Sequence, residues 1–138
     1  MSEPSYTPGQ RATFAKTITE ADVSTFAGLT GDFNPIHVDA EYAKRARFGE
    51  RIAHGMLTAG LISTVMGMRL PGPGGIYLSQ TLRFRKPVRI GDTITAVAEV
   101  TAYEAPRRLL KLRTSCANQH GETVIDGDAV VLVDSVQE

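Results

Sequence analysis

Apolar and polar residues follow two different periods along this chain, and the change of period divides it into two halves. Apolar positions in the first half mostly recur at helical spacing, whereas those in the second half alternate with polar positions, as in half-buried strands. Turn-forming pairs separate the alternating segments. Strands are predicted at 76–86, 93–103, 109–117 and 123–133. Helices followed by a run of strands predict an α+β class, with the helices on one face of an antiparallel sheet.

The first half begins with a strand and a capped helix. Residues 11–18 alternate as a strand does, although Lys16 falls on the face that is otherwise apolar. Thr19 is a typical helix N-cap, and Asp22, three residues later, completes a carboxylate variant of the capping box. The helix is expected to end just before Gly31, because glycine readily adopts the left-handed conformation of a C-terminal cap.

The most apolar segment, 55–69, has apolar residues on nearly every face of a helix. A helix with this pattern is normally buried, so we expect the sheet to curl around it. Strong helix breakers at 71–75 end it. Between the two long helices we expect a loop at 32–38, because proline lacks an amide donor, and a short helix over 39–46.

The composition is that of an ordinary globular protein. Its 138 residues suit one domain, 1–138, in which residues 1–10 form a loose N-terminal arm. Lys and Arg total 15, as do Asp and Glu, so no net charge draws the chain to nucleic acid or to an anionic membrane. No signal peptide or membrane span is readable. Cys116 is the only cysteine, which fits a reducing compartment, and we expect a cytoplasmic location.

Candidate chemistry appears first in the predicted loop, where Asp32 and His37 stand five positions apart. In an extended or turning loop, such groups can converge on one small object such as a water molecule. A carboxylate near an imidazole in a partly dry cleft can serve as a general acid–base pair. The alternative is that Asp32 only shapes the turn and that His37 is an ordinary hydrogen-bonded side chain. Asn34 and Pro35 fit turn chemistry.

The start of the apolar helix offers an electrophilic partner for that pair. The first N–H groups of a helix have no intrahelical acceptor and carry partial positive charge. Gly55 would let a ligand approach the backbone closely, and its N–H could polarise a carbonyl. The alternative is a glycine needed for packing, preceded by His54 as a cap. Ser63, on the same helix, is a supporting candidate, although a lone serine in an apolar helix often bonds to its own backbone.

Other kinds of site lack their sequence patterns. The three histidines are not at metal-binding spacing, so no metal is expected. There is neither a nucleophilic-serine elbow nor a phosphate-binding glycine loop, and no cofactor is expected. Basic residues cluster at Arg83, Arg85 and Lys86. They either form a solvated sheet face or contact the phosphates of a nucleotide-like carrier.

Two segments carry a family resemblance. GDFNPIHVD at 31–39 and FGERIAHGM at 48–56 resemble the hydratase motif of the MaoC-like, (R)-specific enoyl-CoA hydratases. FRKPVRIGDT at 84–93 also resembles a strand–turn segment of that family, but similar segments recur in related folds. The similarity covers nearly the whole chain.

The resemblance implies a hot-dog fold, in which an antiparallel sheet wraps a long central helix, and usually a homodimer. It also implies hydration of trans-2-enoyl-CoA to (R)-3-hydroxyacyl-CoA and the reverse dehydration. By the same resemblance, Asp32 and His37 would position and activate the water, and Gly55 would donate its N–H to the thioester oxygen. Asn34 and Ser63 would support them.

The carrier and the length of the acyl chain stay open. Candidates for the floor of an acyl tunnel are Leu61, Ile62, Val65, Met66 and the loop 71–75. A dehydratase of carrier-protein thioesters, with or without a partner subunit, would use the same site. A thioesterase fits less well, because the acid–imidazole pair suits addition of water to a double bond. A non-catalytic acyl-thioester-binding protein is a further alternative. Pairing of two sheets would cover an exposed edge, which also favours a homodimer.

Overall fold

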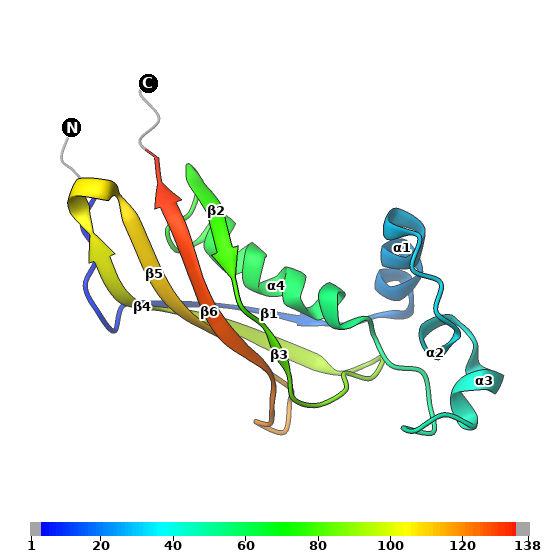
Figure 1. Cartoon of the computed structure of the whole chain (residues 1–138). Helices are drawn as coiled ribbons and strands as arrows, with labels where there is room; N and C mark the ends of the chain where they lie inside the picture. Colours follow the sequence, from blue (N-terminus) through cyan, green and yellow to red (C-terminus); the bar gives the residue numbers. More distant parts are fainter. Residues whose placement is uncertain (1–3, 135–138) are drawn as a thin grey trace.

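An antiparallel sheet curves along one side of a central helix in the computed structural model, which describes residues 4–134 (Figure 1). The strands are β1 (Arg11–Thr17), β2 (Gly75–Gln80), β3 (Arg83–Phe84), β4 (Thr93–Glu104), β5 (Leu109–Ala117) and β6 (Thr123–Val133). The helices are α1 (Glu20–Thr30), α2 (Pro35–Val38), α3 (Ala40–Lys44) and α4 (Gly55–Met68), and a single 3-10 turn, η1, covers Ala105–Arg107. The α+β class predicted from the alternation of polar and apolar residues is therefore confirmed.

The strand order is β1-β4-β5-β6-β2, and β3 also pairs with β6. The prediction of one strand over 76–86 is wrong, because the segment breaks into β2 and β3. Gln80 lies opposite Ala129 and Arg83 lies opposite Asp126, so both pieces keep one register with β6. At the break, a Cβ on Gly127 would lie 1.8 Å from the Thr81 carbonyl oxygen. The two backbones approach too closely there for an ordinary ladder.

The core lies between α4 and the inner face of the sheet. Alternate residues of β4 from Ile94 to Val100 are buried, as predicted, but the register with β5 shifts after Val100 and leaves Ala102 only half-buried. Cys116 is fully buried in this core, and its burial raises the pKa of the thiol to about 12. Cys116 therefore serves as a small apolar core residue.

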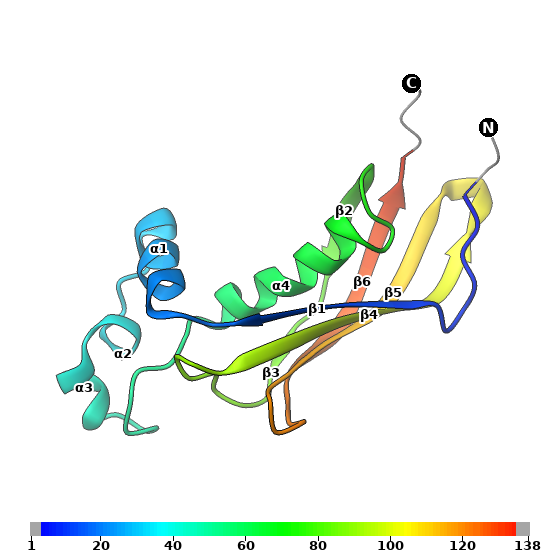
Figure 2. The same cartoon turned by 180° about the vertical axis from the view of Figure 1, so that it is seen from behind.

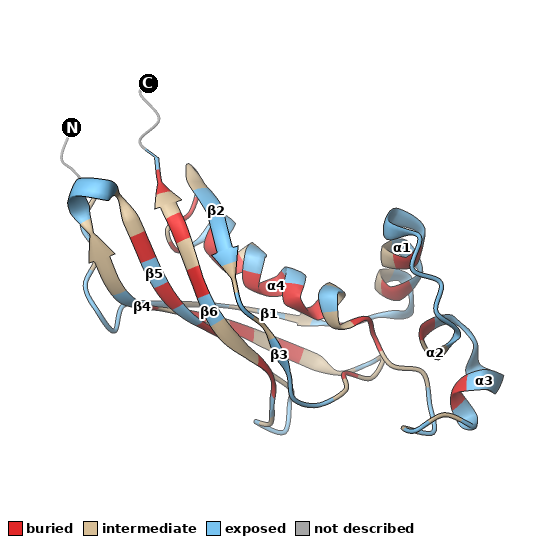
Figure 3. Ribbon diagram, in the orientation of Figure 1, coloured by how far each residue is buried: buried red, intermediate tan, exposed pale blue. Residues whose placement is uncertain are grey.

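Helix α4 is buried on one face only (Figure 3). Its buried residues are Thr58, Ala59, Leu61, Ile62, Val65 and Met66. Met68 keeps 70% of its surface exposed, and Met56 is exposed as well. The sheet curls along α4 as expected, but within the single chain it covers only one side of the helix (Figure 2). No helix within residues 4–134 is long and apolar enough to cross a membrane.

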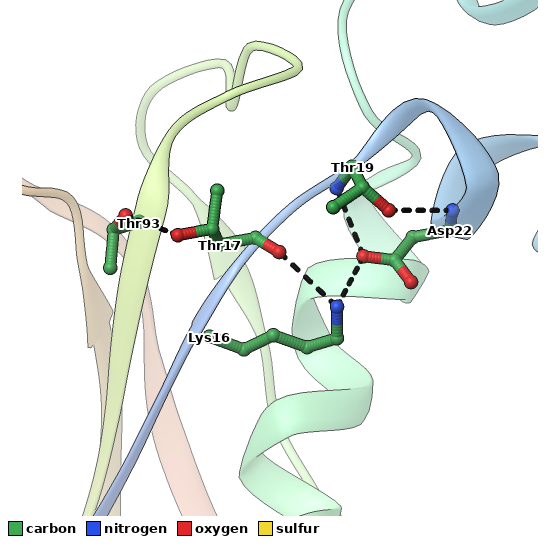
Figure 4. A network of polar contacts seen from close by, with 5 residues as sticks. All are labelled: Lys16, Thr17, Thr19, Asp22 and Thr93. Atoms are coloured by element: carbon green, nitrogen blue, oxygen red, sulfur yellow. Dashed lines mark hydrogen bonds and ion pairs between the residues drawn. The ribbon is translucent and has the colours of Figure 1, made fainter.

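The junction of β1 and α1 explains why a lysine lies on an otherwise apolar strand face (Figure 4). The Thr19 and Asp22 backbone N–H groups each donate to the other's side chain, which confirms the predicted capping box. The Lys16 ammonium pairs with the Asp22 carboxylate and donates to the Thr17 carbonyl. The bond from Lys16 is the main cause that lowers the pKa of Asp22. Lys16 thus reaches past the core and fixes α1 to the end of β1.

Helices α1, α2 and α3 project beyond one end of the sheet (Figures 1 and 2). Gly31 ends α1 in the left-handed conformation, with φ of 86°, as predicted. The predicted loop at 32–38 is wrong over its last four residues, which form α2. Pro35 is the first residue of that helix, where its fixed φ is favourable and no amide donor is required. Similarly, α3 is shorter than the predicted helix over 39–46.

The described part of the N-terminal arm is held in place. The Gly9 N–H donates to the Val100 carbonyl and the Val100 N–H donates to Gln10, at 2.9 and 2.8 Å. The ring of Tyr6 lies edge-on to that of Tyr103, with centroids 5.0 Å apart. Residues 4–10 are therefore attached to the sheet rather than loose, and residues 1–3 of the predicted arm lie outside the described residues.

Candidate active site

A cavity of about 450 Å³ lies at the N-terminal end of α4, where α2 and the segment after β3 meet. Its wall includes Asp32, His37, His54, Gly55, Thr58 and Phe84. The acid, the imidazole and the helix-opening glycine that the sequence singled out are thus brought together. They come from two segments separated by α3 and an irregular link.

Asp32 is held by a chain of short turns. Its N–H donates to the Thr30 hydroxyl, and its Oδ1 accepts the Asn34 N–H, both at 3.2 Å. Asn34 in turn accepts the Ile36 N–H and caps α2, so turn chemistry at this position is confirmed. Among the described residues, none bonds to Asp32 Oδ2 in the structure. That oxygen is therefore available to a ligand.

His37 has a defined tautomer. Its Nδ1 lies 2.7 Å from the Ile52 carbonyl oxygen. A carbonyl can only accept, so Nδ1 carries the hydrogen and Nε2 of the neutral ring keeps its lone pair. Burial lowers the pKa of His37 below 6.5 and His54 adds to the effect, whereas the bond to Ile52 and the charge of Asp32 oppose it. The ring is therefore ready to accept a proton on Nε2 near neutral pH.

His54 belongs to the same site, which the sequence reading missed. It is 2% exposed, and its ring stacks on that of His37 with centroids 3.9 Å apart and planes inclined by 30°. Its Nε2 donates to the Asp32 backbone carbonyl at 2.9 Å. His54 occupies the N-cap position of α4, as the alternative had it, but its side chain makes no cap bond to the helix. The available signal was its position directly before Gly55.

Gly55 opens α4 against the ring of Phe84. A Cβ at this position would lie 2.6 and 2.8 Å from two carbons of that ring, so a side chain could not be added without moving Phe84. The Gly55 N–H is the first of the helix and has no acceptor within it. Gly55 can therefore be required for packing against Phe84 and can also admit a ligand. The Phe84 ring is itself 54% exposed, so it does not close the site around Gly55.

Two buried polar atoms close to the site have no partner among the described residues. They are Nδ1 of His54 and Oγ1 of Thr58, which stands one helical turn after His54. Thr58 lines the cavity and was not singled out from the sequence. Unpaired buried polar atoms are costly, so a ligand or water molecule that bonded to either would be favoured.

Asp32, His37 and His54 also form a group with metal-ligand chemistry. Their potential ligand atoms all lie within 4.8 Å of one another. The histidines are far from metal-binding spacing in the sequence, but folding brings two of them together. Each ring already commits one nitrogen to a carbonyl, so one nitrogen of each ring remains. A tetrahedral metal would need both of these nitrogens and Asp32 to converge on one point, whereas the two rings pack against each other with centroids 3.9 Å apart.

The remaining candidate residues lie in four different places. Arg85 and Lys86 line the cavity, paired with Asp126 and Glu122 respectively. Arg83 is exposed and does not line it. Ser63 lines a second groove, of about 400 Å³, between α4 and β2. The four side chains suggested for the floor of an acyl tunnel are buried in the core and line neither space: Leu61, Ile62, Val65 and Met66.

Comparison with known proteins assigns the family. A model of the MaoC like domain matches residues 4–119. The chain belongs to the MaoC-like family. It is 53% identical over 125 residues to an (R)-specific enoyl-CoA hydratase of Rhodospirillum rubrum, which covers 91% of this chain and 86% of the relative. It is 51% identical to a 3-hydroxybutyryl-CoA dehydratase of Methylorubrum extorquens, over 89% of this chain and 78% of that one.

A solved (R)-hydratase structure has the same fold. The (R)-hydratase from A. caviae involved in PHA biosynthesis superposes with a TM-score of 0.90 at 43% identity, covering 94% of this chain and 98% of that chain. The hot-dog fold implied by the sequence motifs is therefore confirmed. The family resemblance noted at 31–39 and 48–56 is confirmed as well.

Proposed function

We propose that this protein is a hydro-lyase that adds water to trans-2-enoyl-CoA and forms (R)-3-hydroxyacyl-CoA, reversibly. One observation carries the proposal: the Asp32 carboxylate, the His37 imidazole and the Gly55 N–H border the same cavity. This set suits the addition of water to a double bond that is conjugated to a thioester. Relatives named as (R)-specific enoyl-CoA hydratase and 3-hydroxybutyryl-CoA dehydratase support the same reaction in its two directions.

In the hydration direction, a water molecule is held between Asp32 and Nε2 of His37. Nε2 takes one proton of the water as its oxygen bonds to C3 of the substrate. The electron pair of the double bond moves toward the thioester oxygen, and an enolate forms. His37, now protonated, returns that proton to C2, so the net addition is one hydroxyl at C3 and one hydrogen at C2. Asp32 accepts the second O–H of the water and favours the imidazolium.

The thioester oxygen receives its stabilisation from the start of α4. The Gly55 N–H points out of the first turn, where the helix dipole places partial positive charge. A donor aligned before the reaction stabilises the developing enolate without reorganisation. The lack of a side chain at Gly55 lets the thioester come close to the backbone. The orientation of the bound enoyl chain relative to Asp32 and His37 would then give the (R) configuration.

The experiment follows hydration of crotonyl-CoA by the purified protein, with analysis of product configuration. The Asp32→Asn variant should lose activity on the order of 10²–10⁴-fold. Asp39→Asn is the matched control, because Asp39 caps α3 through its side chain and lies outside the cavity wall. Near-wild-type hydration by Asp32→Asn, or formation of the (S) product, would contradict the proposal.

The carrier of the acyl group is tested in the same assay. Arg85 and Lys86 line the cavity, where they could approach the phosphates of a coenzyme A substrate. We therefore propose the CoA thioester as the preferred substrate, with the carrier-protein thioester as the alternative. Rates on the two thioesters of one acyl chain decide between them, and a higher kcat/KM on the carrier-protein thioester would reverse the assignment.

We also propose that the chain forms a homodimer. The edge strand β2 and the uncovered face of α4 carry exposed apolar residues, among them Met56, Met68, Ile76 and Leu78. A second copy would supply both a pairing edge and a cover for this face. The molar mass of the wild type from light scattering should be that of two chains, and Leu78→Lys should lower the molar mass toward that of one chain. A wild-type monomer would contradict this part of the proposal.

A further inference from the structure

Three hydrogen bonds interlock His37 with the segment that precedes α4. The Arg51 Nε–H donates to the His37 carbonyl at 2.6 Å. The Ile52 N–H donates to the Ile36 carbonyl at 3.3 Å, and His37 Nδ1 donates to the Ile52 carbonyl at 2.7 Å. The backbone on either side of the ring and the ring itself are therefore fixed to the same two residues, Arg51 and Ile52.

The outer end of Arg51 is anchored as well. Its Nη1 and Nη2 donate to the two carboxylate oxygens of Glu20 at 2.8 and 2.9 Å. Glu20 is the first residue of α1. The Arg51 side chain is 19% exposed and that of Glu20 is 59% exposed, so the guanidinium is largely covered while the carboxylate faces water. The two parallel N–H···O bonds fix the geometry of the pair. The guanidinium thus joins α1, α2 and the segment that leads into α4.

We propose that Arg51 is a positioning residue for the reaction, which sets the tautomer of His37 without touching substrate. Arg51 does not line the cavity. It holds the His37 backbone in the position that keeps the Ile52 carbonyl opposite Nδ1. When this position is lost, Nδ1 loses its acceptor and the hydrogen is free to move to Nε2. In the neutral tautomer with its hydrogen on Nε2, that nitrogen has no lone pair to accept a proton from the water. This inference rests on the proposed role of His37 as base.

The contact requires an arginine in particular. Three donors in a rigid plane meet one carbonyl on one side and a carboxylate on the other. A lysine has a single nitrogen on a flexible stem and cannot reach both acceptors in the same geometry. Arg51→Lys should therefore restore the function of Arg51 only in part.

Arg69 provides a matched control. Its Nη1 donates to the Thr13 carbonyl at 2.6 Å, the same kind of bond at the same distance, and its guanidinium lies 5.8 Å from the Phe14 ring centroid. It stands at the other end of α4 from the cavity. Arg69→Met therefore removes a comparable arginine–carbonyl bond without touching His37.

The experiment compares Arg51→Met, Arg51→Lys and Arg69→Met by two readouts. Nitrogen-15 NMR of histidine-labelled protein reports the tautomer of each ring, and the chain has only three histidines. The wild type should show His37 hydrogenated on Nδ1, and Arg51→Met a mixture of tautomers. Its kcat should fall about 10–100-fold, the scale expected for a misplaced catalytic group, with little change in KM. Arg51→Lys should be intermediate and Arg69→Met close to the wild type.

The two readouts separate this inference from the proposed function. A wild type without hydratase activity would contradict the proposed function, and the NMR spectra alone would then decide what Arg51 does to His37. The inference is overturned if Arg51→Met keeps the wild-type tautomer, whatever its kcat. It is equally overturned if the tautomer changes and kcat does not, or if Arg69→Met loses as much kcat. Should Arg51→Met fail to fold, Arg51→Lys carries the same comparison.

Discussion

The imidazole of His54 packs against that of His37, with ring centroids 3.9 Å apart and planes inclined by 30°, and its Nε2 donates to the backbone carbonyl of Asp32. One buried side chain therefore contacts both members of the acid–imidazole pair. The charge of a protonated His54 ring also opposes protonation of His37 and contributes to lowering the pKa of His37. His54 consequently acts on the geometry of the site and on its protonation.

Replacement of His54 by phenylalanine should separate these effects from simple packing. Phenylalanine retains a ring against His37 but has no donor for the Asp32 carbonyl. We expect kcat to fall about 10-fold or more, as for other displaced catalytic groups. The pKa of His37 should rise, although burial still holds it down. The acid limb of kcat/KM against pH should then move to higher pH. His120→Phe, at an exposed turn, is the control, and an unchanged pH profile in His54→Phe would contradict this role.

The activity should persist below the pH at which an ordinary histidine is protonated. His37 is the proposed base, and its burial lowers its pKa below 6.5. Its neutral form therefore remains populated as the pH falls past 6.5. The acid limb of kcat/KM should lie below that value. If the acid limb of kcat/KM in the wild type lay at or above pH 6.5, the environment of His37 would not lower its pKa.

The same depressed pKa links folding stability to pH. Between 6.5 and the lower pKa of the folded state, the unfolded chain binds more protons at His37 than the folded chain does. Stability is therefore lost as the pH falls through this window, and it is retained above 6.5. Urea unfolding across the window should show the decline in the wild type and a smaller one in His37→Asn. If the free energy of unfolding fell equally steeply with pH in the two proteins, His37 would not be the group responsible.

A residue's role could be predicted from the sequence where its partners are close to it along the chain, and not where folding brings them together from a distance. Asp32, His37 and Gly55 were identified because each lies in a short motif whose local chemistry is readable. His54 and Arg51 stand within the second motif, but their roles depend on contacts with Asp32, His37 and Glu20 that only folding creates. Sequence spacing alone does not specify ring stacking or a guanidinium bridge.

The errors in the fold have the same origin. The apolar pattern of 55–69 correctly predicted α4, but it contains no information on which partner covers each face. The break between β2 and β3 depends on how closely Thr81 approaches Gly127, two residues far apart in sequence. By contrast, the Thr19 capping box and the Gly31 cap are local and were predicted correctly.

Removal of metal ions should leave hydration intact. Asp32, His37 and His54 come within 4.8 Å of one another, but the two imidazole rings pack against each other and His37 Nε2 is needed as a base. Dialysis against a chelator, with elemental analysis of the protein before and after, should change kcat by less than about twofold. Loss of activity that zinc restores would mean that these three groups bind a metal in the working enzyme.

Gly55→Ala tests the approach of the thioester to the start of α4. The new Cβ meets Phe84 at 2.6 Å, so Phe84 must move, and the methyl group also stands beside the N–H that would receive the thioester oxygen. We expect kcat to fall on the order of 10²-fold, similar to loss of an oxyanion donor.

The double variant Gly55→Ala/Phe84→Ala distinguishes the two causes. Removal of the Phe84 ring relieves the clash within the protein, but the methyl group still obstructs the thioester, so activity should stay low. Gly67→Ala is the control on the same helix, since nothing lies within 4 Å of its added Cβ. That change should raise stability by about 0.5–1 kcal/mol, because alanine is the better helix former, and leave kcat unaltered. Recovery of activity in the double variant would instead assign Gly55 a packing role alone.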